Sequence, residues 1–169
     1  MGKVLLFISA LIFVLGFSVI ANAIHETIPS ETQIPLPGPN AEKLYEYIVR
    51  YKPYTEWELW PKKGKFYEGT EPHGAPLTTF VDDAAFHSIF EKKGMADGSI
   101  IVKENIADKK SVTLTVMYKI KGYNPDAGDW FWAKYNPDGK VEASGKVKGC
   151  IDCHGKMKDN DYIFTGKVK

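Results

Sequence analysis

The segment Ser111-Val-Thr-Leu-Thr-Val-Met-Tyr-Lys-Ile120 alternates large apolar side chains with threonine, methionine and lysine along its whole length. Successive side chains of a β-strand point to opposite faces of its sheet, so an alternation with a period of two indicates a strand. The large apolar residues that share one face are Val112, Leu114, Val116, Tyr118 and Ile120. The segment therefore predicts a strand that covers a hydrophobic core on that face.

Three further segments on either side have the composition of strands: residues 74–81, 99–106 and 129–135. Sequences that favour turns bound the predicted strands: Asp97-Gly98, Asn124-Pro125-Asp126 and Pro137-Asp138-Gly139. Strands of this length separated by turns are typical of an antiparallel arrangement. We therefore expect an antiparallel sheet of about four or five strands.

Two amphipathic segments predict helices. Asn40 is a good N-cap residue, and apolar side chains at three- and four-residue spacing predict a helix from Ala41 to about Tyr51. A similar apolar stripe predicts a second helix over Asp82–Lys93, which Gly94 ends. With the strands, these helices predict an α+β fold, mainly an antiparallel β-sheet with two or three short helices.

The first 23 residues have the features of a signal peptide. Lys3 precedes an apolar run from Val4 to Ile20, and Ala21-Asn22-Ala23 is a small-residue cleavage site. An uncleaved anchor is the alternative, because the run approaches the length of a membrane-spanning helix. We expect export to the bacterial periplasm with cleavage after Ala23, a Pro-rich segment over residues 24–39, and one domain over residues 40–169.

The composition excludes one class of partner. Lys and Arg number 22 and Asp and Glu number 21, so the net charge is +1. Binding of nucleic acid requires lysine and arginine clustered on one face, so we expect no nucleic-acid partner. The only two cysteines are Cys150 and Cys153, and a disulfide between them would close too short a loop to stabilise the fold usefully. Their role has to be chemical.

Cys150-Ile151-Asp152-Cys153-His154 is the attachment signature of a c-type haem. Two thiols three positions apart can each add to one of the two vinyl groups of a porphyrin, and the next histidine then lies beneath the iron as its ligand. A redox dithiol and half of a zinc site are the alternatives, but a zinc ribbon requires a second cysteine pair. The motif predicts one covalent haem c, with His154 as the ligand of the iron.

A sixth ligand of the iron has to come from upstream of the motif or be absent. Met157 follows His154 by only three residues and cannot reach the opposite face of a haem. The upstream candidates are His73, Met95, Met117 and His87. His73 is the strongest, because packing or surface positions account for the other three. A vacant sixth position would make the iron a binding site for small molecules.

Several segments together resemble the cytochrome P-460 family and its relatives, the cytochromes c-prime-beta. The matching segments, in chain order, are Trp60-Pro61 with Gly69 and Pro72-His73-Gly74-Ala75, Asp97 to Asn105, Val116 to Lys119, Gly122 to Pro125 with Asp129 to Trp132, and Gly149 to His154. The resemblance covers about residues 40–158. It implies a mainly antiparallel β-sheet domain, a homodimer and a single covalent haem ligated by His154.

The resemblance implies two activities. Members of the P-460 type oxidise hydroxylamine, pass the electrons to a soluble acceptor cytochrome, and carry an additional bond between a lysine and a meso carbon of the porphyrin. The matching lysine here is Lys103, which shares a strand face with Ile101 and Asn105, while Lys63 and Lys65 are alternatives. Hydroxylamine oxidation also requires a proton acceptor. The resemblance implies a distal carboxylate, for which Asp129 is the best match.

Other assignments stay open at this point. Asp126 or Glu104 could replace Asp129, whose side chain is one methylene shorter than a glutamate. Relatives of the c-prime-beta type lack the lysine bond and bind nitric oxide in an apolar pocket, for which the candidates are Phe80, Phe86, Phe131 and Trp132. Plain electron transfer, with His73 or a methionine as the sixth ligand, is a third possibility. The sequence favours hydroxylamine oxidation, because it contains both a matching lysine and a carboxylate.

Overall fold

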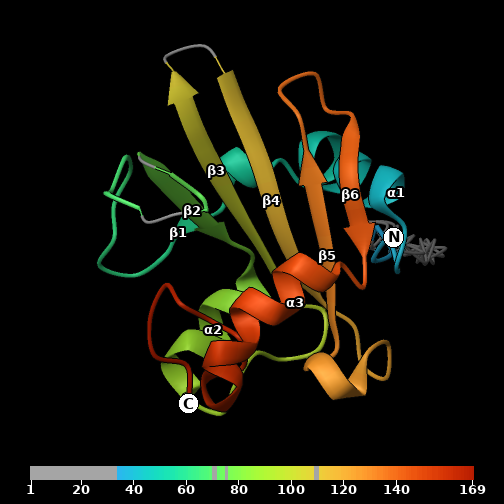
Figure 1. The fold of residues 1–169 in the computed structure, drawn as a ribbon, viewed down its shortest axis with the longest axis vertical. Coiled ribbons are helices and arrows are strands. Elements are labelled where there is room, and N and C mark those ends of the chain that lie inside the picture. The colour runs from blue at the N-terminus through green and yellow to red at the C-terminus, as the bar shows by residue number, and fades with distance from the viewer. Residues whose placement is uncertain (1–33, 70–71, 75, 109–110) are drawn as a thin grey trace, which may run out of the picture. The chain divides into compact units, whose positions relative to one another are not determined.

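Six strands form one antiparallel sheet in which every strand pairs with the next strand along the chain (Figure 1). The structure is a computed structural model and describes residues 34–69, 72–74, 76–108 and 111–169. The strands are β1 Glu58–Leu59, β2 Leu77–Val81, β3 Ile100–Asp108, β4 Ser111–Lys119, β5 Trp130–Tyr135 and β6 Val141–Gly145. Turns can join consecutive antiparallel strands, as the turn sequences predict, and a helix lies in the connection between β2 and β3.

The fold class predicted from the sequence is confirmed, and the sheet has more strands than expected. The alternating segment is the central strand β4, flanked by β3 and β5. The two unpredicted strands lie at the two edges, where β1 has two residues and β6 is built from small and polar side chains. Neither edge strand has the run of large apolar side chains that identifies a buried strand.

The first helix, α1 Ala41–Glu46, begins where the sequence predicts. The side chain of Asn40 accepts a hydrogen bond from the N–H of Lys43 at 2.8 Å, which satisfies one of the free donors of the first turn. The helix continues as a π-helical turn over Tyr47–Tyr51, so the predicted end at about Tyr51 agrees with the structure. A 3-10 turn over Tyr54–Glu56 follows.

The second helix, α2 Asp83–Glu91, follows β2 directly. Asp82 is its N-cap, and the helix ends at Lys92 in the left-handed conformation, two residues before the predicted Gly94. A third helix, α3 Lys148–His154, contains the CxxCH motif and runs into a 3-10 segment over Gly155–Asn160. A short 3-10 turn over Pro125–Ala127 precedes β5.

The two faces of the sheet bury two separate cores. One face carries the large apolar side chains of the predicted alternation and packs against α1 and the π-helical turn that follows it, through Leu44 and Ile48 among others. The other face packs against α2, α3 and the C-terminal segment, through Trp130, Trp132 and Ile163 among others. Helix α3 crosses in front of the sheet in Figure 1, so the CxxCH motif lies over the second face.

The predicted signal peptide over residues 1–23, its cleavage after Ala23, and residues 24–33 of the Pro-rich segment lie outside the described residues. Residues 34–169 form one compact unit, which begins six residues before the domain start expected at residue 40. Among the described residues, no helix has both the length and the apolar character that a membrane span requires.

Candidate haem site

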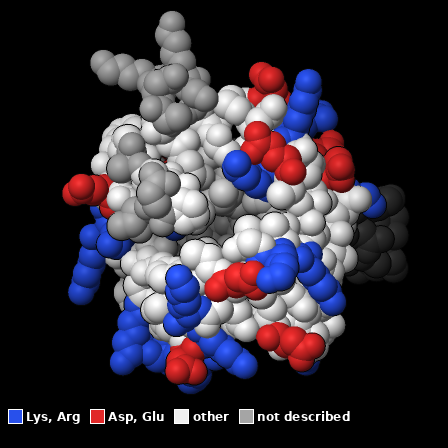
Figure 2. All heavy atoms as spheres, viewed as in Figure 1, with Lys and Arg blue, Asp and Glu red and all other residues white. Residues whose placement is uncertain are grey.

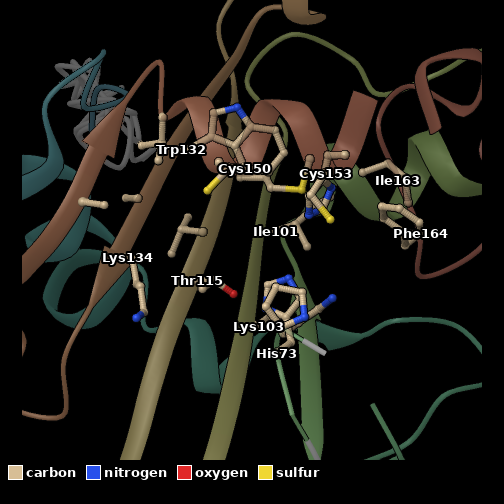
Figure 3. Close-up of a pocket in the computed structure, with 18 of the residues that line it drawn as sticks. His73, Ile101, Lys103, Thr115, Trp132, Lys134, Cys150, Cys153, Ile163 and Phe164 are labelled. Atoms are coloured by element: carbon tan, nitrogen blue, oxygen red, sulfur yellow. The ribbon is translucent and has the colours of Figure 1, made fainter. Parts of the chain in front are cut away.

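Helix α3 presents both cysteines and His154 to one cavity. Cys150 and Cys153 are one helical turn apart, so their side chains lie on the same face of α3. Both thiols are free and half-buried, and both line the cavity beneath the helix (Figure 3). Burial raises the pKa of Cys150, so its thiol stays protonated in this apolar setting.

His154 is held with one particular nitrogen free. Its Nδ1 lies 2.7 Å from the carbonyl oxygen of Tyr162, and a carbonyl can only accept, so Nδ1 donates and Nε2 keeps its lone pair. The rings of Trp132 and Phe164 pack edge-on at centroid distances of 4.6 Å and 5.2 Å. Burial lowers the pKa of His154, which favours the neutral imidazole that a metal requires.

Asp161, the residue before Tyr162, holds the carbonyl oxygen of Tyr162 in place. The carboxylate of Asp161 forms an ion pair with Lys119 at 2.6 Å and accepts the N–H of Met95 at 2.7 Å. The carbonyl of Asp161 accepts the indole N–H of Trp130 at 3.0 Å. Asp161 and Tyr162 both adopt the left-handed conformation, which turns the chain back toward α3. His154 is therefore oriented by a rigid segment of the C-terminus.

The sheet supplies the wall of the cavity opposite α3. Strand register places two rows of side chains side by side across this face: Ile101, Met117 and Trp132 in one row, and Lys103, Thr115, Lys134 and Ala143 in the next. All seven residues line a cavity of about 240 Å³ between the sheet and α3. A second cavity of about 240 Å³ adjoins it and shares His73, Lys103, Cys153 and His154.

Lys103 points into this cavity, as the alternation of β3 predicts. Its neighbours on the strand, Val102 and Glu104, face the other side, where Val102 joins the first core and Glu104 accepts a hydrogen bond from Tyr54 at 2.9 Å. Burial, and secondarily the charge of Lys63, lowers the pKa of Lys103 to about 8. More of its amine is therefore uncharged, and nucleophilic, at neutral pH than that of a surface lysine.

His73 lies on the opposite side of the cavity from the two thiols, close to Lys103 (Figure 3). Its Nδ1 is 3.0 Å from the side-chain oxygen of Asn105, and its ring centroid is 6.2 Å from that of His154. Burial, and secondarily the charge of Lys103, lowers the pKa of His73 to about 4. The ring is therefore neutral at physiological pH.

The structure does not bring Asp129 to the cavity. Asp129 adopts the left-handed conformation in the turn before β5, and its two carboxylate oxygens accept the N–H groups of Gly122 and Asn124 at 3.0 Å and 2.9 Å. It is therefore a turn carboxylate. The two alternatives lie elsewhere as well, because Asp126 is exposed in the same turn and Glu104 faces the other side of the sheet.

Some of the remaining candidates for the sixth ligand, the lysine bond and the apolar pocket line the two cavities, and the others lie elsewhere. Met117 lines the cavity, whereas Met95 is buried in the second core and His87 is exposed on α2. Among the alternative lysines, Lys63 lines the second cavity, while the ammonium of Lys65 lies 5.9 Å from the ring centroid of Phe80 and lines neither cavity. Of the four expected apolar residues, Trp132 lines the cavity, Phe80 and Phe131 belong to the first core, and Phe86 packs against the second core.

Several residues of the site have no signal in the sequence. Ile163, Phe164 and Thr165 line the cavity from the C-terminal segment, and Tyr67 and Glu68 line the second cavity from the loop after β1. Loop residues carry no periodicity, so their direction depends on tertiary contacts. Glu68 is the one carboxylate among the described residues that line these two cavities.

The residues present fit a covalently attached haem. Two thiols one helical turn apart lie at the edge of a largely apolar cavity, and a buried imidazole beside them has its metal-binding nitrogen free. On the face shown in Figure 2, acidic and basic side chains are interspersed, and no patch of one sign covers it.

Comparison with known proteins agrees with this assignment. A family model described as cytochrome P-460 matches residues 52–165, which include the strands, the loop with His73 and the CxxCH motif. No curated protein matches the sequence.

Proposed function

The chain belongs to the cytochrome P-460 family, and from that premise we propose an exported cytochrome with one haem c that oxidises hydroxylamine and passes the electrons to a soluble acceptor cytochrome. The thiols of Cys150 and Cys153 hold the porphyrin through two thioether bonds, and Nε2 of His154 binds the iron. When bound, the haem supplies a redox centre with a coordination position for a small nitrogenous molecule.

The position of Lys103 is the observation that supports hydroxylamine oxidation. Its amine lies in the same cavity as the two thiols and His154, and burial lowers its pKa to about 8. Only an uncharged amine has the lone pair needed to form a bond to a porphyrin carbon. The new bond replaces one N–H and one C–H bond, so two protons leave to solvent and two electrons pass to an oxidant such as peroxide. Lys103 is therefore the lysine we propose for the bond to the porphyrin, and Lys63 is the alternative from the adjoining cavity.

The proton acceptor that we propose in place of Asp129 is Glu68. Its side chain lines the second cavity, which shares His154 and Lys103 with the first. Glu68 is exposed, so it can pass to solvent the protons that leave hydroxylamine with the electrons. It therefore connects the cavity to water without placing a charge among the apolar side chains of the sheet.

Binding of nitric oxide without turnover is the second candidate. It is favoured by the wall of the first cavity, where the described lining residues include no carboxylate and are mostly apolar. Such a wall suits a small uncharged ligand, which loses little solvation on entry. The two candidates differ in one property that can be measured, the bond from Lys103.

Mapping of haem peptides tests the proposal. We expect proteolysis of the haem-loaded protein to leave the Lys103 peptide attached to the haem, together with the Cys150 and Cys153 peptide. We also expect a red-shifted main absorption band and oxidation of hydroxylamine with an artificial electron acceptor. Lys103→Arg should release its peptide and lose turnover, while Lys65→Arg, which lines neither cavity, should retain both properties.

A free Lys103 peptide in the wild type, with no oxidation of hydroxylamine and with tight binding of nitric oxide, would favour the second candidate. Protein that carries no covalent haem would contradict both. The three outcomes are separated by measurements on one preparation.

A further inference from the structure

The wall that the sheet contributes to the haem cavity changes from apolar to polar with distance from α3. The row that runs from Ile101 to Trp132 packs in the second core together with Cys150 of α3. The next row lies two residues further along the strands and consists of Lys103, Thr115, Lys134 and Ala143. In Figure 3 the labelled members of this second row lie on the side of the cavity away from the two thiols.

A haem of the c type has the same division of polarity. Its two thioether bonds form at the edge of the porphyrin that carries the vinyl groups, and its two propionate carboxylates are on the other two pyrrole rings. Attachment at Cys150 and Cys153 therefore directs both carboxylates away from α3, toward the polar row of the sheet. A carboxylate that leaves water requires a cation or hydrogen-bond donors in exchange.

Lys134 is the cation best placed for one of these carboxylates. Of the described residues that line the two cavities, three are lysines: Lys63, Lys103 and Lys134. The bond proposed above would occupy the amine of Lys103. Each propionate-bearing pyrrole is next to a vinyl-bearing one, so one carboxylate lies on the side of each cysteine. Lys134 and Cys150 line the first cavity only, whereas Lys63 lines the second only, so Lys134 is the lysine on the Cys150 side.

The surroundings of Lys134 leave its ammonium able to bind a further anion. Its Nζ lies 2.8 Å from a carboxylate oxygen of Glu142, and an ammonium has three donors, so this ion pair does not exhaust it. Its partner across the strand pair is Ala143, whose small side chain leaves room beside the lysine stem. The side chain of Lys134 is 49% exposed, so it stands at the mouth of the cavity, where a propionate keeps part of its hydration.

We propose that the ammonium of Lys134 binds one propionate carboxylate of the haem and fixes the position of the porphyrin edge that points away from α3. The inference rests on the haem attachment proposed above. Lys134 is a positioning residue, because the thioether bonds and His154 already hold the haem and the iron. Its register partner is Thr115, which is also the partner of Lys103, so Lys134 orients the porphyrin directly beside the lysine proposed for the meso-carbon bond.

Resonance Raman spectra of the full-length, haem-loaded protein test this contact, because the bending band of a haem propionate rises in frequency as its hydrogen bonds strengthen. Lys134→Met should lower the frequency of one propionate band, and Lys134→Arg should keep it near the wild-type value, since a guanidinium also donates to a carboxylate. Loss of the cation should raise the pKa of that propionate, so the pH at which the reduction potential becomes pH-dependent should move upward.

Lys148→Met is the matched control. It removes one charge from an exposed lysine of α3 that forms an ion pair with Asp152 and lines neither cavity, so both measurements should match the wild type. An unchanged propionate band in Lys134→Met, or an equal shift in Lys148→Met, would overturn the inference. The same unchanged band with covalent haem and hydroxylamine oxidation would leave the proposed function intact. A shifted band in a protein without turnover would support the contact and contradict the proposed activity alone.

Discussion

The carbonyl oxygen of Tyr162 determines which nitrogen of His154 is free to bind a metal. The CxxCH motif does not reveal which nitrogen is free, because the acceptor is a backbone atom whose position depends on the left-handed conformations of Asp161 and Tyr162. The orientation of His73 likewise depends on a tertiary contact, a hydrogen bond between its Nδ1 and the side-chain oxygen of Asn105, 32 positions away in the sequence. At the residue scale, the sequence therefore identifies the groups that react, and tertiary contacts orient them.

The two cysteines should each contribute one bond to the haem. Cys150→Ala and Cys153→Ala should each retain a haem held by a single thioether, with a visible spectrum typical of one remaining vinyl group. Intact-mass spectrometry under denaturing conditions shows whether the haem stays attached, and the spectrum of the reduced haem in alkaline pyridine shows how many vinyl groups remain. The double variant should carry no thioether bond to haem. A single variant whose spectrum shows both vinyl groups converted to thioethers would contradict the assignment.

Asp129→Ala should lower the stability of the fold and leave turnover per haem unchanged. The variant loses a carboxylate that accepts two backbone N–H groups, and it places alanine in a left-handed conformation that aspartate tolerates better. We expect a loss of about 2 kcal/mol in urea denaturation. Asp126→Ala, an exposed position in the same turn, is the control and should change stability by less than about 0.5 kcal/mol. A fall in turnover per haem would instead return Asp129 to the catalytic site.

At the scale of elements, period-two alternation predicted β4, while strand composition and bounding turn sequences predicted β2, β3 and β5. These signals succeeded because the buried side chains of the four strands are large. They failed for β6, whose side chains are mostly small and half-exposed, and which owes its place to pairing with β5. The helical form of the CxxCH motif was not predicted either, because residues 148–154 lack an apolar stripe and α3 is stabilised by packing on the second core.

The half-buried N-cap of α2 should make stability depend on pH. Asp82 accepts the N–H groups of Ala85 and Ile100 through one oxygen, and burial raises the pKa of its carboxyl to about 6 although these hydrogen bonds oppose the shift. The folded state then binds the proton more tightly than the unfolded state does. The contribution of Asp82 is therefore present below about pH 4 and is lost as the pH rises to about 6.

Asp82→Asn tests this dependence, because the amide oxygen can still accept both N–H groups and carries no charge. We expect the stability of the variant relative to wild type to increase between pH 4 and pH 7, as measured by urea denaturation at several pH values. Glu91→Gln, at an exposed position at the other end of α2, is the control and should show a flat difference. A difference for Asp82→Asn that is independent of pH would show that the carboxyl titrates normally.

At the scale of the domain, the C-terminal segment joins the haem cavity to the centre of the sheet. Asn160 donates to the carbonyl groups of Ile163 and Gly166 and accepts the N–H of Val168, which holds the segment in a closed loop. The next residue, Asp161, forms its ion pair with Lys119 at the end of β4. The orientation of His154, the packing of the second core and the central strand are therefore parts of one cooperative unit.

The ion pair between Lys119 and Asp161 should accordingly be a main determinant of stability. Its side chains are 15% and 6% exposed, and the ammonium of Lys119 also lies 4.8 Å from the ring centroid of Trp130. Removal of one partner leaves the other charge buried and unpaired, so Lys119→Met should cost about 3–5 kcal/mol in urea denaturation. The double variant Lys119→Met with Asp161→Asn should recover part of this loss, because no unpaired charge remains.

Arg50→Met is the control for the same loss of a positive charge. Its partner Glu46 lies 3.2 Å away, the two side chains are 73% and 40% exposed, and we expect a change of at most about 1 kcal/mol in the free energy of unfolding.

Loss of the ion pair should also affect the orientation of His154. Tyr162, whose carbonyl oxygen accepts the hydrogen bond of His154, is the residue next to Asp161, so Lys119→Met should weaken that hydrogen bond. The haem-loaded variant should then show an altered ferric spectrum that the double variant partly restores. Destabilisation with an unchanged spectrum would show that the C-terminal loop orients His154 independently of the ion pair.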